Sequence, residues 1–197
     1  MAPQHPSIDE ALIRDLAPPA PLTTRLMTRE ELDDLWRIER RELVHEIYVA
    51  DADGRLTLTP AFYDTLGWPE DELETELPIL RSHLDQGGVG IGVYDNGLLV
   101  GAAVLAGTGV TGYPELRQLV FLHVSHDWRG RGIAAALYRL CAETGRRMGA
   151  SGLYISASST RRTVEFYQHL GAAPTARPDE ALLRHEPYDI HMIHRFL

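Results

Sequence analysis

The chain has 197 residues, of which 44% are hydrophobic and 24% charged, and its formal net charge is −9. This length predicts one compact domain, and the apolar fraction is too high for a disordered chain. The sequence has no apolar run of the roughly 18 residues that a membrane-spanning helix needs, and its first residues do not resemble a secretory signal. Its acidic balance and lack of lysine argue against binding to nucleic acid or to an anionic membrane. A single cysteine, Cys141, excludes an internal disulfide, so we expect a cytoplasmic protein.

The charge is distributed unevenly along the chain. Residues 1–27 carry −1, residues 28–86 carry −10 and residues 87–197 carry +2. This distribution indicates that two regions face different partners.

The first predicted elements follow a proline-rich segment. Residues 1–21 contain five prolines, which predicts a mostly disordered tail with a short helical stretch near 8–16. A single folded domain would then occupy 22–197, with a short first strand at 22–27. Thr28 and Glu31 fit a capping box, and apolar side chains recur at helical spacing as far as residue 47. The pattern predicts a helix from residue 28 to about 50, either continuous or broken in the middle.

The second half of the chain shows clearer signals. Residues 55–70 are predicted to be irregular, and residues 71–85 form a helix that Pro78 divides or begins. The tripeptide Asp95-Asn96-Gly97 lies between two apolar runs and predicts a β-hairpin. Further strands are expected at 116–125, 153–157 and 189–196, and further helices at 133–148 and 160–170. This order predicts a mixed α+β fold.

The junction between a strand and a helix at residues 123–135 carries the most informative motif. Gly130 and Gly132 allow a tight turn, and the helix after them starts with unpaired N–H groups, which suits a phosphate or pyrophosphate. The spacing Gly130-x-Gly132-x-x-Ala135 also fits an NAD(P)-binding Rossmann oxidoreductase. Against that alternative, the upstream hairpin is antiparallel, and the next strand is followed by serines instead of an acidic residue for a ribose.

Two motifs resemble the Gcn5-related N-acetyltransferase (GNAT) superfamily. Arg129-x-x-Gly132-x-Ala134 resembles its first signature, and residues 158–171, with Phe-Tyr-Gln-His-Leu-Gly at their end, resemble its second. The resemblance spans about residues 22–197 and is most specific over 118–171. It implies a GNAT-like, mostly antiparallel central sheet flanked by helices, with a splay between the fourth and fifth strands. It also implies direct transfer of an acetyl group from acetyl-CoA to a primary amine.

The resemblance assigns roles to individual residues. Tyr167 matches a tyrosine that protonates the departing thiolate. The residues expected to bind the cofactor are Leu122, His123, Val124, Arg129, Gly130, Arg131, Gly132, Ile133, Ala134, Ala135 and Thr160. Many relatives carry asparagine where this chain has Thr160. Gln118 and Ile155 occupy the positions of the glutamate base of some relatives and cannot replace it, so the base is unassigned, with His45 and Glu46 as the nearest candidates.

The acceptor is expected to bind to the first helices, where the −10 segment lies. The residues expected to contact it are Trp36, Glu39, Glu42 and Glu46. These carboxylates form either a solvated face or a vestibule for a cationic small molecule, such as an aminoglycoside-like antibiotic. The alternatives are a protein N-terminal or lysine acetyltransferase and a non-catalytic acyl-CoA-binding module. No metal ion is expected, and the resemblance allows a homodimer.

Overall fold

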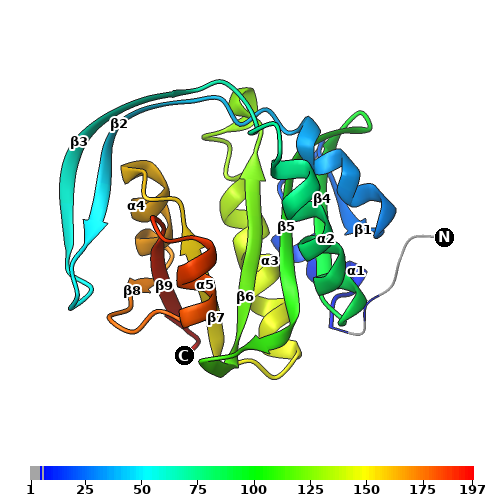
Figure 1. Cartoon of the computed structure of the whole chain (residues 1–197). Coiled ribbons are helices and arrows are strands. Elements are labelled where there is room, and N and C mark those ends of the chain that lie inside the picture. Colours follow the sequence, from blue (N-terminus) through cyan, green and yellow to red (C-terminus); the bar gives the residue numbers. More distant parts are fainter. Residues whose placement is uncertain (1–4, 6) are drawn as a thin grey trace.

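A seven-stranded sheet in the order β1-β4-β5-β6-β7-β9-β8 forms the centre of the molecule (Figure 1). The computed structural model describes residue 5 and residues 7–197. The strands are β1 Thr23–Met27, β4 Val89–Asp95, β5 Leu98–Val110, β6 Tyr113–Val124, β7 Gly152–Ala157, β8 Ala173–Pro174 and β9 Ile190–Arg195. All neighbouring strands are antiparallel except β6 and β7. The predicted mixed, mostly antiparallel α+β sheet is therefore confirmed.

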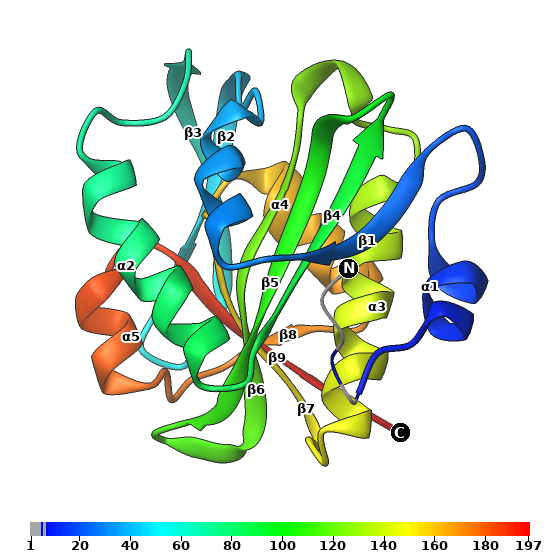
Figure 2. The same ribbon diagram turned by 90° about the vertical axis from the view of Figure 1, so that its right-hand side faces the viewer.

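Helices cover both faces of this sheet (Figure 2). One face carries α1 Glu10–Leu16, α3 Ile133–Arg147 and α4 Arg161–His169. The other carries the 3-10 helix η1 Glu30–Arg37 together with α2 Glu72–Asp85 and α5 Glu180–His185. A short 3-10 turn, η2 His126–Trp128, precedes α3. Separate apolar clusters fill the two interfaces, because every central strand buries side chains on both faces.

The hairpin predicted at residues 95–97 is confirmed. β4 and β5 pair antiparallel on either side of Asn96 and Gly97, whose φ angles are 47° and 84°. Two positive φ values in a two-residue loop are typical of a type I′ turn, whose twist matches that of the flanking strands.

The helix predicted from residue 28 to about 50 is wrong in its second half. The capping box is present, since Thr28 N–H donates to Glu31 Oε2 at 2.8 Å and Glu31 N–H donates to Thr28 Oγ1 at 3.2 Å. The helix that it starts ends at Arg37, and Glu42–Ala50 is a strand, β2. It pairs with β3, Leu56–Thr65, in the region predicted to be irregular. The tertiary pairing of the two segments overrides the helical spacing, and the β-branched and aromatic residues of β2, Val44, Ile47, Tyr48 and Val49, favour a strand.

The short helical stretch expected near residues 8–16 is present as α1, beside which Ile8 and Leu12 are buried in the apolar cluster next to α3, and residues 1–4 and 6 of the predicted tail lie outside the described part. The structure differs from the expectations at two other places. Pro78 lies inside α2 without dividing it. The short elements β8 and α5 were not predicted, since neither is long enough to show a periodic pattern.

Candidate active site

β6 and β7 separate within the sheet, as the predicted splay requires. Their parallel pairing ends at Leu119 and Ile155, the fourth register pair. Beyond that point β6 is held only by β5, as far as Val124, and β7 only by β9, as far as Ala157. The edge of β6 that faces β7 is therefore open over its last five residues.

Backbone groups of β6 point into this splay. Ser125 N–H donates to Val100 O at 2.9 Å, toward β5, whereas Val124 O accepts a hydrogen bond from Arg129 Nε at 3.0 Å on the other edge. Because backbone groups of successive strand residues point to opposite edges, the N–H groups of Val124 and Leu122 face the splay. No strand in the described part of the chain pairs with this edge beyond Leu119, so these donors are available to a carbonyl oxygen of a ligand.

The glycine turn before α3 fits a pyrophosphate. Gly130 and Gly132 have φ values of 76° and 79°, and a Cβ at either would meet nothing within 4 Å. Glycine is thus required by the backbone conformation, and the space beside it is open. The first hydrogen bond that closes the helix runs from Ala136 N–H to Gly132 O at 3.0 Å, so the amides of Ile133, Ala134 and Ala135 have no partner within the helix. The predicted cofactor residues 130–135 therefore form a cradle of N–H donors.

The two arginines of the motif differ in their contacts. Arg129 Nη1 donates to Arg41 O at 2.9 Å, in addition to the bond from its Nε to Val124 O, so its half-buried guanidinium joins the end of β6 to the segment before β2. Arg131 is exposed, donates to Asp127 O at 3.0 Å and lies 4.5 Å from the centre of the Trp128 ring. Arg131 is therefore the more accessible of the two for an anion.

A cavity of about 500 Å³ lies between β2, the turn before α3 and the start of α4. It is lined by Glu42, Leu43, Val44, His45, Glu46, His126, Arg129, Thr160, Arg161, Arg162 and Glu165. Residues predicted for the acceptor, Glu42 and Glu46, thus share it with residues predicted for the cofactor, Arg129 and Thr160. Glu46 pairs with Arg161 at 2.7 Å, and Thr160 Oγ1 accepts the Thr163 N–H at 3.3 Å and caps α4. Both side chains therefore already have structural partners.

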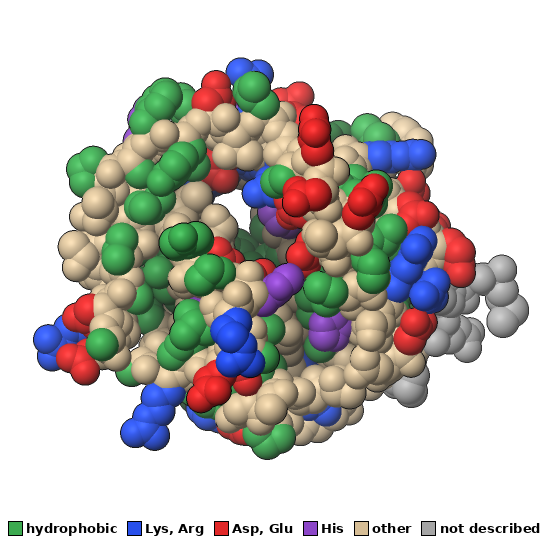
Figure 3. All heavy atoms as spheres, viewed as in Figure 1, with side chains coloured by type: hydrophobic (Ala, Val, Ile, Leu, Met, Phe, Trp, Pro, Cys, Tyr) green, Lys and Arg blue, Asp and Glu red, His purple; other side chains and the backbone are tan. Residues whose placement is uncertain are grey.

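The segment 39–48 crosses from one side of the splay to the other. At its start, Glu39 N–H donates to Ser125 Oγ at 3.1 Å and Glu39 O accepts the His126 N–H at 2.9 Å. At its end, Tyr48 N–H donates to Ser159 O at 2.8 Å, next to α4. The hairpin of β2 and β3 then arches away from the body, and the space-filling view shows an opening beneath it (Figures 1 and 3).

An aromatic group lies on the α2 side of the splay. The ring of Trp68 lies 5.8 Å from that of Trp36 and 4.9 Å from that of His123, and Arg40 lies 4.6 Å from its centre. Trp68 Nε1 donates to Ile38 O at 2.8 Å, which fixes the ring. Burial, and then Arg40 and Arg129, lower the pKa of His123 to about 3, so its imidazole is neutral at neutral pH.

Tyr167 lies on the opposite side, where α4 packs on the sheet. Its ring is buried at 6% exposure, belongs to the same apolar cluster as Val124 and Ile133, and lies 5.9 Å from the ring of Tyr138. Burial raises the pKa of its hydroxyl. Within the described residues this hydroxyl forms no hydrogen bond, whereas that of the neighbouring Tyr138 contacts His194.

Carboxylates line the α2 and α5 side of the opening. Glu72 pairs with Arg40 at 3.0 Å and Glu76 with His185 at 3.2 Å, which ties α2 to its surroundings. Asp189 lies directly before β9, and burial, followed by the charge of Glu186, raises its pKa to about 7. Neither Asp189 nor Glu72 was predicted as a site residue, because only the fold brings these distant segments together.

Across the described part of the chain, no helix combines the length and apolarity that crossing a membrane would require. Among the same residues no cluster of three or more histidine, cysteine, aspartate or glutamate side chains could hold a metal ion.

Comparisons with known proteins agree with this geometry. The family model described as "Acetyltransferase (GNAT) family" matches residues 28–172, about three quarters of the chain. No curated protein sequence matches the chain significantly. Among solved structures, nourseothricin acetyltransferase superposes with a TM-score of 0.64 at 18% identity, covering 88% of this chain and 98% of that one.

Two further solved structures share the fold. A protein named as a streptothricin acetyltransferase, from Bacillus anthracis str. Ames and in complex with acetyl coenzyme A, has a TM-score of 0.62 at 14% identity, covering 89% of this chain and 99% of that one. The ribosomal-protein-S18-alanine N-acetyltransferase from Escherichia coli has a TM-score of 0.55 at 15% identity, with 88% and 93% covered.

Proposed function

Because the chain belongs to the acetyltransferase (GNAT) family, we propose that it acetylates a primary amine of a cationic small molecule. The chain is an N-acetyltransferase that uses acetyl-CoA as its acyl donor. The proposal concerns the acceptor and the residues that act on each substrate. Its Rossmann alternative fails because β6 and β7 are the one parallel pair in the described sheet.

Acetyl-CoA supplies a thioester carbonyl, and the chain supplies hydrogen-bond donors for it. The free N–H groups of Leu122 and Val124 would orient the pantetheine arm and polarise the carbonyl in the splay. The amides of residues 130–135 would hold the pyrophosphate, assisted by Arg131. Tyr167, from α4, would donate a proton to the sulfur as the C–S bond breaks.

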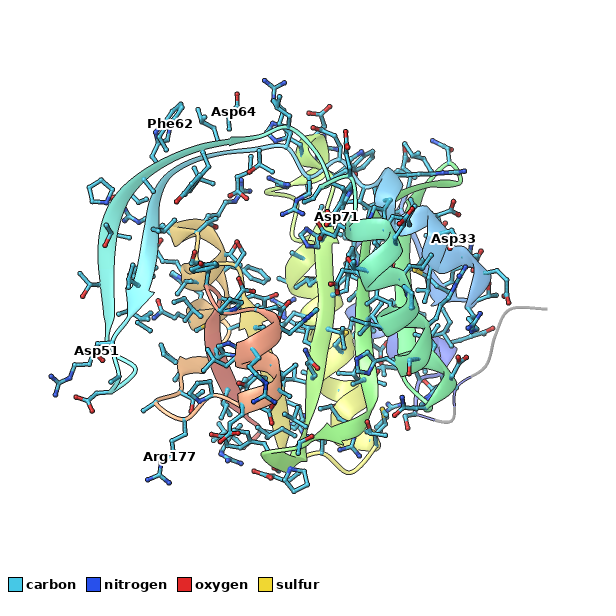
Figure 4. All side chains as sticks on the ribbon, viewed as in Figure 1. Asp33, Asp51, Phe62, Asp64, Asp71 and Arg177 are labelled. Atoms are coloured by element: carbon cyan, nitrogen blue, oxygen red, sulfur yellow. The ribbon has the colours of Figure 1, made fainter. Side chains whose placement is uncertain are left out.

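The observation that carries the choice of a cationic acceptor is the start of α2. Five carboxylates lie between residues 70 and 76, next to Trp68: Glu70, Asp71, Glu72, Glu74 and Glu76. Acidic side chains gather on this end of α2 beside the opening, and Asp71 is labelled there (Figures 3 and 4). A concentration of one charge at the mouth of a site raises the local concentration of ligands of the opposite charge. We therefore assign the attraction of a cationic acceptor mainly to these carboxylates, in addition to the predicted Glu42 and Glu46, which line the cavity.

The comparisons support a streptothricin-like antibiotic as the acceptor. The names of two solved structures with the same fold specify nourseothricin and streptothricin. We therefore propose a role in resistance to antibiotics of this kind. A protein N-terminal amine is the second candidate, since a third structure with this fold is named for the alanine of a ribosomal protein.

One acceptor screen tests the proposal. Release of the free thiol of coenzyme A from acetyl-CoA would be measured with streptothricin, kanamycin, spermidine, an alanine-initiated peptide and a lysine peptide. We expect streptothricin or another polycation to give the highest kcat/KM. Turnover restricted to a peptide would replace the small-molecule proposal with the protein acceptor. Binding of acetyl-CoA without thiol release in any reaction would overturn the proposed catalytic function and support an acyl-CoA-binding module.

A further inference from the structure

We propose that Asp189 is the general base that accepts a proton from the ammonium group of the acceptor. This inference deepens the proposed function and rests on it. It supplies the general base, which was unassigned because Gln118 and Ile155 occupy the positions of the glutamate base of some relatives and cannot replace it.

The position of Asp189 follows from the end of the β7–β9 pairing. Ile190, the first residue of β9, pairs with Ala157, the last residue of β7, two residues beyond the point where β7 leaves β6. Asp189, the residue before β9, therefore lies at the end of β7 where the splay is open. The charges that act on it are those of Glu186, at the end of α5, and of Arg40, which pairs with Glu72 of α2 and lies over the Trp68 ring. These charges indicate the face on which α2 and α5 pack and the proposed acceptor site lies.

Charged groups from several elements act on this carboxylate. Glu186, at the end of α5, opposes its ionisation, whereas Arg40, before β2, favours it. Asp189 is also among the charges that raise the pKa of Tyr167 on α4, after burial and the neighbouring Tyr138 and Cys141. Arg40 further acts on His123. Asp189 thus lies within electrostatic reach of both the proposed acid and the acceptor side.

The chemical state of Asp189 suits a base. Its side chain is half-buried and forms no hydrogen bond to any described residue, so its oxygens are available to an amine or to a water between them. Its pKa, raised to about 7, is far better matched to proton transfer at neutral pH than an ordinary aspartate, whose pKa is about 4.

Other candidates are less suitable. His123 is neutral but a weak base, because its pKa is lowered to about 3. Glu46 is held by Arg161 at 2.7 Å, and Glu72 is held by Arg40 at 3.0 Å. The ring of His45 packs on Phe62, an exposed side chain of the hairpin, at 5.7 Å.

Asp189 accepts one proton from R–NH3+, directly or through one water, and leaves the neutral amine. The nitrogen lone pair attacks the thioester carbon, so a C–N bond forms and the C–S bond breaks. A second nitrogen proton passes to water, and the leaving sulfur is protonated by Tyr167, which regains a proton from solvent. The amide keeps the third proton, and Asp189 returns its own to water.

The test compares Asp189→Asn with the wild-type protein. With the best acceptor of the screen, we expect the kcat/KM of the wild-type protein to rise with pH through about 7. In Asp189→Asn, kcat/KM should be about 10²-fold lower and should no longer show this rise. Asp189→Glu should restore part of the rate. Glu180→Gln, which removes an exposed carboxylate of α5, is the matched control and should keep both the rate and its rise with pH.

A second readout does not depend on turnover. The side-chain carboxyl carbon of Asp189 would be titrated by ¹³C NMR in the protein without substrates. Glu186→Gln should lower the midpoint of this titration and should shift the rise of kcat/KM to lower pH by the same amount. A rise of kcat/KM with pH that persists in Asp189→Asn, or a midpoint near 4, would overturn the role of Asp189 while leaving the acetyltransferase function intact. Absence of wild-type thiol release with every amine would instead overturn the proposed function and this role together.

Discussion

Arg161 Nη1 lies 2.7 Å from Glu46 Oε2, and this ion pair joins the start of α4 to β2 across 115 residues of sequence. Arg161 Nε also contacts Glu165, which in turn accepts a hydrogen bond from Tyr48 at 3.2 Å. Together these contacts hold the hairpin of β2 and β3 against the cavity beside the glycine turn. The hairpin otherwise stands apart from the central sheet, and a two-stranded hairpin has little stability of its own.

Glu46→Gln should therefore loosen the hairpin without unfolding the protein. Hydrogen exchange measured by mass spectrometry should become faster in peptides from residues 42–65, with little change in melting temperature, because exposed ion pairs contribute little to global stability. Glu143→Gln, which breaks a contact with Arg147 on α3, is the control and should leave exchange in the hairpin unchanged. Unaltered exchange in Glu46→Gln would show that backbone contacts alone hold the hairpin.

Gly132→Ala should weaken acetyl-CoA binding. An alanine held at the positive φ of 79° would reduce the stability of the protein by about 1 kcal/mol. If the turn shifts to relieve this strain and one amide no longer contacts the pyrophosphate, the Kd for acetyl-CoA should rise about tenfold. Gly97→Ala is the matched control, since Gly97 has a φ of 84° and equally open surroundings in a distant hairpin. Calorimetry should show a similar loss of stability in both variants but weaker binding in Gly132→Ala alone. Gly132→Glu should abolish the thermal shift with acetyl-CoA, because it adds a negative charge.

Tyr167→Phe should lower kcat by about 10²-fold with little change in the Kd for acetyl-CoA, since only the proton donor is removed. Tyr138→Phe is the control. Its hydroxyl contacts His194 Nδ1 at 2.7 Å, so its loss should reduce stability by about 1 kcal/mol and leave kcat intact. Equal kcat values for Tyr167→Phe and wild-type protein would exclude the acid role.

Neutralising the start of α2 should weaken the binding of cationic acceptors. The triple variant Glu70→Gln, Asp71→Asn, Glu74→Gln should raise the KM for a polycation about tenfold at low salt, and the difference should shrink as salt screens the charges. Asp51→Asn combined with Asp53→Asn removes charge at the tip of the hairpin, away from α2 (Figure 4), and should leave the KM unchanged. The same increase in both variants would point to net charge instead of a local site.

The stability of the protein should depend on pH through His123. Because its folded pKa of about 3 lies below its unfolded value near 6.5, the unfolded state binds more protons between these values, and stability falls as pH drops below about 6.5. Between pH 6.5 and 5 we expect the free energy of urea unfolding to fall by about 1.6 kcal/mol in the wild-type protein, a loss that His123→Gln no longer shows. A parallel loss in the variant would assign the acid sensitivity to other groups.

Local signals predicted much of the fold and the cofactor side of the site. The turn at Asn96-Gly97 and the capping box of Thr28 and Glu31 act within a few residues, so their chemistry is visible in the sequence. The same holds for the turn of Gly130 and Gly132, whose positive φ values and adjacent helix start were expected from their spacing. These features depend on backbone conformation, which neighbouring residues largely determine.

The acceptor side could not be predicted in this way. Glu46 was expected on a helix facing the acceptor, but it lies on β2 and pairs with Arg161. Its strand conformation results from pairing with β3 and with the segment before α4, and a short stretch of sequence does not encode such long-range pairing.

By itself the sequence determined the strand–turn–helix motif, the hairpin, the mixed α+β class and the resemblance to an acetyltransferase. Only the tertiary structure decided which carboxylates border the opening and that Asp189 lies beside the splay. The physical reason is the range of the interactions. Turns and helix starts form through contacts between near neighbours, whereas the burial and charge that raise the pKa of Asp189 come from segments that only folding brings together.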